Sequence, residues 1–349
     1  MGNWEENVRR VVPYVPGEQP SDNNIIKLNT NENPYGPSPR IKKIILDTDY
    51  LRKYPDPKAS LLVDRLAEYH GLDKSQVFVG VGSDDVIAMS FMTFFNSDKP
   101  VLFPDITYSF YDVWADMLGI PYEKKKLDED FNIVKEDYLG GNNGGIIFPN
   151  PNAPTGKLVS LEFIEDIVKA NPDSVVIIDE AYIDFGGETA LPLIDKYENL
   201  LVVRTFSKSR SMAGLRIGYA MGSPKLIRYL NDVKYSFNSY TMNMPSIILG
   251  SEVIADEEYF RECIRKIVET REWFAEKLES LGFRVLPSKA NFVFASPGGM
   301  SAEELFNKAR ENGIFFRYFK APRIDSFLRI TIGTREEMEK VVSFLVSIL

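Results

Sequence analysis

Cysteine and histidine are nearly missing from this sequence, which contains one of each among 349 residues. With Cys263 alone, no internal disulfide framework can form, and this usage fits a reducing compartment. With His70 alone, metal sites built on histidine and Ser-His-Asp triads are nearly excluded, and we expect no metal. His70 precedes Gly71 at a predicted helix end, where a cation interacts favourably with the helix dipole. We therefore assign His70 a structural role.

Excess positive charge and long apolar runs are missing as well. The net charge of −9 argues against bulk nucleic-acid binding, which needs a basic surface. No stretch reaches the roughly 18 consecutive apolar residues of a membrane-spanning helix, and the polar start MGNWEENVRR differs from a secretion signal. We therefore expect a soluble, cytoplasmic protein that binds neither nucleic acid nor membranes.

What the sequence does contain is an alternation of short apolar runs with helical stretches between residues 41 and 245. The runs PVLF, GGIIF, SVVIID and NLLVVRTF are typical of strands that are buried on both faces of a parallel sheet. Residues 41–245 are therefore predicted to form a large, doubly wound α/β domain. Residues 1–40, rich in proline and asparagine, are predicted to form an extended arm rather than a helix or sheet.

The chain changes character over residues 246–349. A long amphipathic helix is predicted at about 256–281 and ends at Gly282. The runs FRVLP, ANFVFAS, GIFFRYF and FLRITIG read as strands around the helix AEELFNKARENG, and REEMEKVVSFLVSIL reads as a closing helix. This pattern predicts a second, smaller α+β domain.

A lysine and a phosphate-binding pattern follow the strand NLLVVRTF. Thr205 and Ser207 precede Lys208, and Arg216 comes eight residues after the lysine. A lysine at a strand end is an amine that can form an imine with an aldehyde. Hydroxyl groups and an arginine can hold a phosphate. An aldehyde and a phosphate on one small molecule describe pyridoxal 5′-phosphate, although Lys208 alone is also explained by a solvated surface loop.

Asp179 ends the preceding apolar strand, SVVIID. A buried carboxylate is costly unless a cation pairs with it, and the pyridinium N–H of the cofactor is such a cation. The pair would keep the ring protonated as an electron sink. Tyr182 is placed to donate a hydrogen bond to the phenolic oxygen of the ring. Because Asp179 and Lys208 end successive strands, we expect both to reach one flat ring.

Other strand ends carry residues that fit the same site. Ser83 and Asp84 begin a helix whose N–H groups suit a phosphate, although they also fit a simple helix cap. Tyr108, which follows PVLF, is either a stacking partner of the ring or a half-buried tyrosine. Asn150 and Asn152 lie in the tight turn NPNAPTG that follows GGIIF. Each feature has an ordinary explanation, but their occurrence at successive strand ends favours one binding site.

The whole chain resembles a known family. NPNAPTG, VVIIDEAYIDF and RTFSKSRSMAGLRIGY resemble the motifs of fold type I pyridoxal-phosphate aminotransferases, and LNTNENPYGPSP, YPDP and FLRITIGTREEM resemble histidinol-phosphate aminotransferases in particular. The resemblance implies that Lys208 holds the cofactor and moves a proton between substrate and cofactor. It implies that the cofactor is bound by Ser83, Asp84, Tyr108, Asn150, Asn152, Asp179, Tyr182, Thr205, Ser207, Lys208, Arg216 and Tyr54.

The resemblance also implies partners. Tyr54 of YPDP matches a position that reaches across a homodimer interface to the neighbour's cofactor phosphate. Tyr14, Arg317 and Arg329 match positions that bind the anionic end of the substrate. A guanidinium binds carboxylate or phosphate in the same fork geometry, although both arginines are also compatible with ordinary surface ion pairs.

One position departs from the family pattern. Where the family has an asparagine directly before the proline, this chain has Ala153. Either Asn150 or Asn152 takes over the contact with the phenolic oxygen of the cofactor, or Tyr182 makes it alone.

The resemblance implies the transamination of histidinol phosphate with 2-oxoglutarate in histidine biosynthesis. An aromatic amino-acid aminotransferase or a phosphothreonine-type decarboxylase on the same scaffold is the alternative. A cofactor-binding module without catalytic activity is a third possibility, which the intact Lys208 and the absence of an attached DNA-binding segment disfavour.

Overall fold

A seven-stranded sheet dominates the computed structural model, which describes residues 4–20 and 25–349. The strand order is β2 (Val77–Gly80), β8 (Gly218–Gly222), β7 (Leu200–Thr205), β6 (Val176–Asp179), β5 (Gly145–Pro149), β3 (Val101–Pro104) and β4 (Tyr122–Lys125). The strands from β7 to β4 are parallel, and β8 is antiparallel to both of its neighbours. The predicted mostly parallel sheet is confirmed. The sequence did not indicate β8, because GYAMG contains glycine and alanine in place of the β-branched residues that mark strands.

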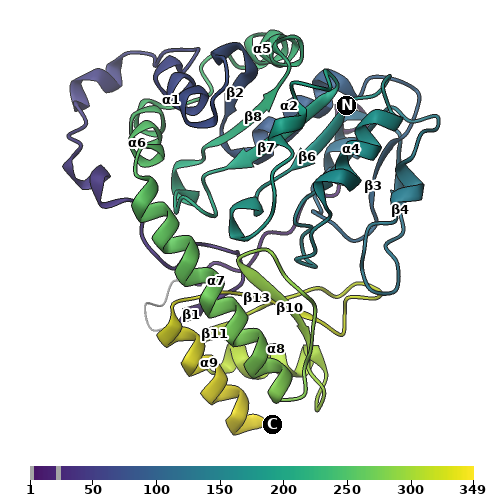
Figure 1. Ribbon diagram of the computed structural model, residues 1–349, viewed down its shortest axis with the longest axis vertical. Helices are drawn as coiled ribbons and strands as arrows, with labels where there is room; N and C mark the ends of the chain where they lie inside the picture. Colours follow the sequence, from purple (N-terminus) through teal and green to yellow (C-terminus); the bar gives the residue numbers. More distant parts are fainter. Residues whose placement is uncertain (1–3, 21–24) are drawn as a thin grey trace.

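Helices cover both faces of this sheet (Figure 1). On one face lie α1 (Ser60–His70), α4 (Leu161–Ala170) and α6 (Met244–Ile254); on the other lie α2 (Gly82–Phe94), α3 (Tyr111–Leu118) and α5 (Pro224–Phe237). Strand β6 shows why its sequence is continuously apolar. Val176 and Ile178 pack into the first core, whereas Ile177 packs into the second. The doubly wound architecture follows from this burial on both faces.

A four-stranded antiparallel sheet forms the second core. Its order is β12 (Arg317–Tyr318), β13 (Leu328–Thr331), β10 (Phe292–Ser296) and β9 (Arg284–Val285). It packs with α7 (Glu257–Ser280), α8 (Ala302–Glu311) and α9 (Arg335–Ile348). In Figure 1, α7 runs from the flank beside α6 down to this smaller sheet. The predicted domain boundary at residue 245 stays a proposal, and the packing of α6 on the large sheet favours a position nearer residue 255.

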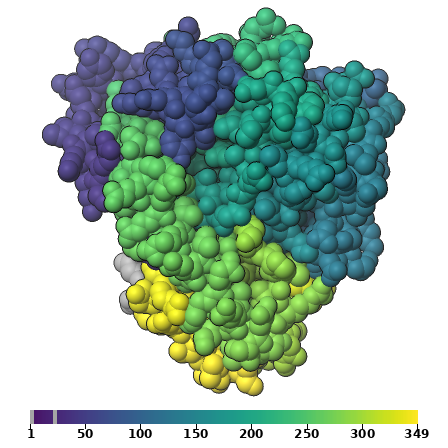
Figure 2. All heavy atoms as spheres, in the orientation of Figure 1, coloured from purple at the N-terminus to yellow at the C-terminus, as the bar shows by residue number. Residues whose placement is uncertain are grey.

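The N-terminal segment is not wholly an arm. Strand β1 (Ile26–Lys27) pairs in parallel with β11 (Ile314–Phe315), so the expectation of a segment without sheet is wrong there. The reason is apolar burial, because Leu28 joins the core of the smaller sheet. Between β1 and α1, short 3-10 helices at Pro39–Lys43 and Thr48–Arg52 lie in a loop on one flank (Figure 1), which Figure 2 shows as a protruding lobe. Within the described residues, no helix is long and apolar enough to cross a membrane.

His70 ends α1 as expected, but not as a cation. Its Nε2 lies 3.1 Å from the Tyr219 hydroxyl. Burial, together with Arg204 and Arg210, lowers the pKa of His70 to about 3. The imidazole is therefore neutral at physiological pH, and its role is packing and hydrogen bonding rather than a favourable interaction with the helix dipole.

Candidate active site

A cavity of about 220 Å³ lies where β5, β6 and β7 end, between the large sheet and the segment that follows β1. It is lined by Thr30, Glu32, Ser83, Asp84, Tyr108, Pro149, Ala153, Asp179, Ala181, Tyr182, Thr205, Ser207, Lys208, Ala213 and Arg216. The structure thus brings most of the predicted cofactor residues together. Thr30 and Glu32 were not predicted, although their motif LNTNENP was among those that resemble the family.

Asp179 is a buried carboxylate without a cation. It is 4% exposed, and within the described part of the chain it forms no ion pair. Its Oδ2 accepts a hydrogen bond from the Tyr111 hydroxyl at 3.0 Å, and its Oδ1 accepts one from the Ala181 N–H at 3.2 Å. Burial raises the pKa of Asp179 to about 6. Such a group lowers its free energy by pairing with a buried N–H cation, so the residues fit a pyridinium ring.

Tyr111 was missed by the sequence analysis. It is fully buried at the start of α3, where its hydroxyl points to the end of β6. The available signal was a second tyrosine close to Tyr108, although Tyr108 lies before α3 and helical spacing does not relate the two. Their rings meet edge to face with centroids 5.7 Å apart. Tyr111 orients Asp179 from behind, while Tyr108 lines the cavity itself.

Lys208 carries the amine of the cavity. Its Nζ donates a hydrogen bond to the carbonyl oxygen of Thr30 at 2.9 Å. Burial, followed by the charge of Arg329, lowers the pKa of Lys208 to about 8. About a tenth of the amine is therefore neutral at pH 7, far more than for an ordinary lysine, and the neutral form is the one that attacks an aldehyde or removes a proton.

An anion site is built at the N-terminus of α2. Gly82 has a φ of +85°, and a side chain on Gly218 would overlap the backbone of Gly82, so β8 packs directly against the helix start. The Arg216 guanidinium lies 3.4 Å from the Ser207 hydroxyl, which is itself 3.0 Å from that of Thr205. Helix N–H groups, hydroxyls and a guanidinium converge, and this donor set fits a phosphate.

The side chain of Asp84 also takes part, although only its backbone was expected to. Its Oδ2 accepts a hydrogen bond from Arg216 at 2.8 Å, and its Oδ1 accepts one from the Tyr108 hydroxyl at 2.7 Å. Asp84 therefore holds both the guanidinium and the aromatic ring in place.

Tyr182 lines the cavity and is fixed by Asn31, which the sequence analysis also missed. The Asn31 side-chain N–H₂ donates to the Tyr182 hydroxyl at 2.9 Å. Asn31 is buried, and its Oδ1 accepts a hydrogen bond from Thr331 of β13 at 3.0 Å. The segment after β1 thus connects the smaller sheet with the end of β6.

The predicted contacts of Asn150 and Asn152 with a cofactor are not supported by their positions. Neither lines the cavity. Asn150 exchanges two hydrogen bonds with the backbone of Val159, at 2.9 and 3.2 Å. Asn152 is saturated by partners in the loops after β3 and β5. Because the turn uses both amides and Ala153 offers no polar group, Tyr182 is the one residue of the three predicted for the phenolic oxygen that lines the cavity.

Arg317 and Arg329 face each other on β12 and β13, where they are Cα partners. Neither forms an ion pair with a carboxylate of the described residues. The Arg329 guanidinium donates to the Asn29 carbonyl at 3.0 Å, but its Nε is buried and has no partner within residues 4–20 and 25–349. Burial lowers the pKa of Arg329. Like charges opposite each other destabilise a sheet, so this pair fits an external anion.

Like Arg317 and Arg329, the two remaining predicted residues lie outside the cavity lining. Tyr14 stacks on Phe110 with ring centroids 4.2 Å apart. Tyr54 is 82% exposed and stacks on Tyr240 at 4.6 Å. Tyr54 therefore does not contact the cavity of its own chain, and its predicted role depends on a second subunit.

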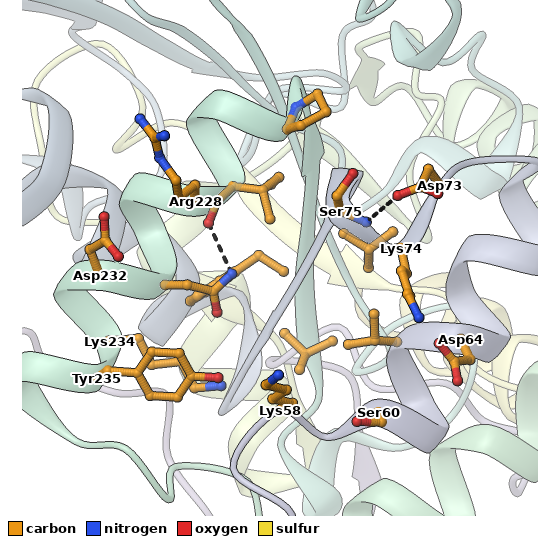
Figure 3. Close-up of a pocket in the computed structure, with 17 residues that line it drawn as sticks. Lys58, Ser60, Asp64, Asp73, Lys74, Ser75, Arg228, Asp232, Lys234 and Tyr235 are labelled. Atoms are coloured by element: carbon orange, nitrogen blue, oxygen red, sulfur yellow. Dashed lines mark hydrogen bonds between the residues drawn. The ribbon is translucent and has the colours of Figure 1, made fainter.

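A larger cavity, of about 540 Å³, lies at the free edge of β2 (Figure 3). Charged side chains of both signs surround it, among them Lys58, Asp64, Lys74 and Arg228. None of the predicted site residues is among those that line it. We therefore place the chemistry in the smaller cavity, where amine, buried carboxylate and anion site meet.

Comparison with known proteins identifies the family. The model of aminotransferases of class I and II matches residues 23–345. A histidinol-phosphate aminotransferase of Clostridium acetobutylicum is 54% identical over 339 residues, which cover 97% of this chain and 96% of the relative. One of Pseudomonas putida is 52% identical over 98% of this chain and 99% of the relative.

A solved structure shares the fold. The histidinol-phosphate aminotransferase of Sinorhizobium meliloti in complex with pyridoxal-5′-phosphate has a TM-score of 0.83 and 23% identity, over 93% of this chain and 92% of the other. The predicted fold is confirmed by this likeness. The predicted cofactor is confirmed by membership of the aminotransferase family. The chain belongs to the pyridoxal-phosphate-dependent aminotransferases of class I and II and, within them, to the histidinol-phosphate aminotransferase family.

Proposed function

We propose that this protein transfers the amino group of histidinol phosphate to 2-oxoglutarate in two half-reactions, as a step of histidine biosynthesis. The observation that carries the proposal is a single cavity that combines the Lys208 amine with the buried, cation-free carboxylate of Asp179. The names of relatives that are more than half identical over nearly their whole length support the choice of substrate.

The cofactor would be held by residues of this chain from several sides. Asp179 would pair with the ring nitrogen, Tyr182 with the phenolic oxygen, and Tyr108 would cover the ring face. Ser207 and Arg216, with the first N–H groups of α2, would hold the phosphate. When bound, pyridoxal phosphate supplies an aldehyde carbon that exchanges amino groups and a protonated ring that accepts the electron pair left at Cα.

The proton transfer is the task of Lys208. Its Nζ would remove the proton from the substrate Cα and hold it until it is returned to the product. The pKa of about 8 leaves enough neutral amine for this role at physiological pH. The hydrogen bond to the Thr30 carbonyl restrains the amine on the side of the segment that follows β1.

The substrate anion is assigned to Arg317 and Arg329. Histidinol phosphate has no α-carboxylate but carries a phosphate, whereas glutamate carries two carboxylates. Two guanidinium groups without a carboxylate partner among the described residues would accept either anion in the same fork geometry. Tyr14 would approach this anion from the N-terminal segment.

The proposal is tested by comparing kcat/KM for histidinol phosphate with that for phenylalanine, tyrosine and phosphothreonine, with 2-oxoglutarate as acceptor where the reaction needs one. We expect histidinol phosphate to be clearly preferred. A preference for an aromatic amino acid, or release of CO₂ from phosphothreonine, would replace the proposal by the corresponding alternative on the same scaffold.

The active form is proposed to be a homodimer in which Tyr54 reaches the cofactor phosphate of the neighbouring subunit. Exposed apolar side chains in the flanking loop support this: Ile45 is 94% exposed and Leu51 63%. Light scattering after size exclusion tests it, and a fully active monomer would contradict it. A cytoplasmic location stays a prediction.

A further inference from the structure

The cavity contains a third carboxylate, that of Glu32, which neither cofactor binding nor proton transfer uses. Of the acidic residues that line the cavity, Asp84 pairs with Arg216, and Asp179 is assigned to the ring nitrogen. Glu32 forms an ion pair with Lys27, and its side chain is 44% exposed, compared with 20% for Lys27. The carboxylate is therefore the more open member of the pair, and it belongs to a residue that lines the cavity.

Glu32 belongs to the wall that faces the reactive amine. Two residues earlier, the Thr30 carbonyl accepts the hydrogen bond from Lys208 Nζ at 2.9 Å, and the Thr30 hydroxyl accepts one from Lys27 Nζ at 2.6 Å. The negative charge of Glu32 also favours the charged form of Lys208. Glu32 and Lys208 therefore line one cavity, close enough for the charge of the first to act on the second.

The two proposed substrates carry different groups at Cα, and the same site has to bind both. At Cα, histidinol phosphate carries a phosphorylated CH₂ group where glutamate carries a carboxylate. It carries an imidazolylmethyl group where glutamate carries a carboxyethyl group. If the anionic ends share Arg317 and Arg329, one further subsite has to accept an imidazole N–H in one half-reaction and a carboxylate in the other.

We propose that Glu32 is a specificity-determining residue, whose carboxylate accepts the hydrogen bond of the substrate imidazole. Lys27 is its counter-ion and compensates the negative charge when the distal carboxylate of glutamate occupies the same subsite. The inference rests on the proposed function and adds the residue that selects the imidazole. The chemistry is complementary, because a carboxylate is an acceptor-only group and an imidazole N–H is a donor.

The test measures each half-reaction separately in the holoenzyme, through the absorbance change of the cofactor. Glu32→Gln keeps the size of the side chain but removes its charge. We expect kcat/KM for histidinol phosphate to fall about tenfold or more, as for the loss of a charged hydrogen bond, with glutamate changed by less than about twofold. Lys27→Gln leaves the carboxylate uncompensated and should shift the preference in the opposite direction, against glutamate.

The control is Glu18→Gln, which removes a carboxylate that precedes β1 and pairs with Arg310 at 2.8 Å, outside the cavity. It should leave both half-reactions unchanged.

Two outcomes overturn the inference and leave the proposed function intact. One is an equal loss on both substrates in Glu32→Gln, and the other is the same direction of change in Glu32→Gln and Lys27→Gln. A wild-type enzyme without a histidinol phosphate half-reaction overturns the proposed function itself. Because the two variants shift preference in opposite directions, general damage to the fold cannot imitate the expected result.

Discussion

Two neighbouring carboxylates at the end of β6 have opposite surroundings. Glu180 is fully satisfied: its Oε2 pairs with Arg204 at 2.9 Å and accepts a hydrogen bond from Thr189 at 2.7 Å, and its Oε1 accepts one from the Ala190 N–H at 2.6 Å. Asp179 lines the cavity and, as far as the chain is described, receives only neutral donors, although it is about equally buried.

The difference separates a carboxylate that stabilises the fold from one that is available to a ligand. A buried charge with its own cation stabilises the arrangement of the chain, here by tying β6 to β7. A buried charge without one is an incomplete interaction that a ligand can complete. The cavity side of β6 and β7 is therefore prepared for a cofactor, whereas the opposite side is closed by the protein itself.

The largest effect is expected on the cavity side, from Lys208→Ala. Loss of the amine removes both the covalent anchor and the proton carrier, so transamination should fall by at least about 10³-fold while the fold remains intact. Single-turnover absorbance measures the loss, and thermal unfolding checks the fold. Lys157→Ala is the matched control, because Lys157 contacts Asn132 outside the cavity and should leave the rate unchanged. Comparable losses in both variants would contradict the assignment.

On the opposite side, at Glu180, we expect a substitution to lower the stability of the fold. Glu180→Gln leaves the Arg204 guanidinium buried with its strongest partner removed, so the free energy of unfolding should fall by about 3 kcal/mol or more. Asp179→Asn is the matched control, because it changes the neighbouring carboxylate at the end of β6. Without cofactor this variant should be no less stable than the wild type, but it should lose transamination. Chemical denaturation measures both. If Asp179→Asn destabilises as strongly as Glu180→Gln, the contrast between the two carboxylates is wrong.

A third prediction concerns pH. The pKa of Asp179 is raised from 3.8 to about 6 in the folded protein. Its contribution to stability is therefore fully present below the unfolded pKa and is lost as the pH rises through the folded pKa. Without cofactor, the wild type should lose about 3 kcal/mol relative to Asp179→Asn between about pH 4 and pH 7. Urea unfolding at each pH measures this. With cofactor bound the difference should shrink, and an unchanged difference would argue against pairing with the ring.

Sequence reasoning found the residues whose positions follow from short-range rules. Asp179 and Lys208 end apolar runs, and parallel strands bring such ends together regardless of the loops between them. Strand β8 escaped because its burial depends on close packing by Gly218 rather than on β-branched residues. Asn31 escaped because its partner Tyr182 is 151 residues away, a contact that no local pattern encodes.

The predicted cofactor contacts of Asn150 and Asn152 show a second limit of reasoning from sequence. Amide side chains in a turn have the right chemistry for a ligand, but the turn can use the same groups for its own backbone. Whether an asparagine points outward or inward depends on the loops that pack on it, here the segments at Val159 and Ile106. Those contacts become visible only when the strands are assembled.

The smallest predicted effect sharpens the contrast at Asp179 itself. Tyr111→Phe removes the one side-chain hydrogen bond that Asp179 receives from the described residues, at 3.0 Å, so the pKa of Asp179 should rise further. Because a smaller share of Asp179 is then ionised, kcat should fall about tenfold at neutral pH, and the acidic limb of the pH–rate profile should move to higher pH. Tyr138→Phe is the matched control, because the Tyr138 hydroxyl is buried without a hydrogen-bond partner in the described part of the chain, and its removal should be neutral or stabilising. If the two variants behave alike, Tyr111 only fills space, and the orientation of Asp179 depends on the backbone of Ala181.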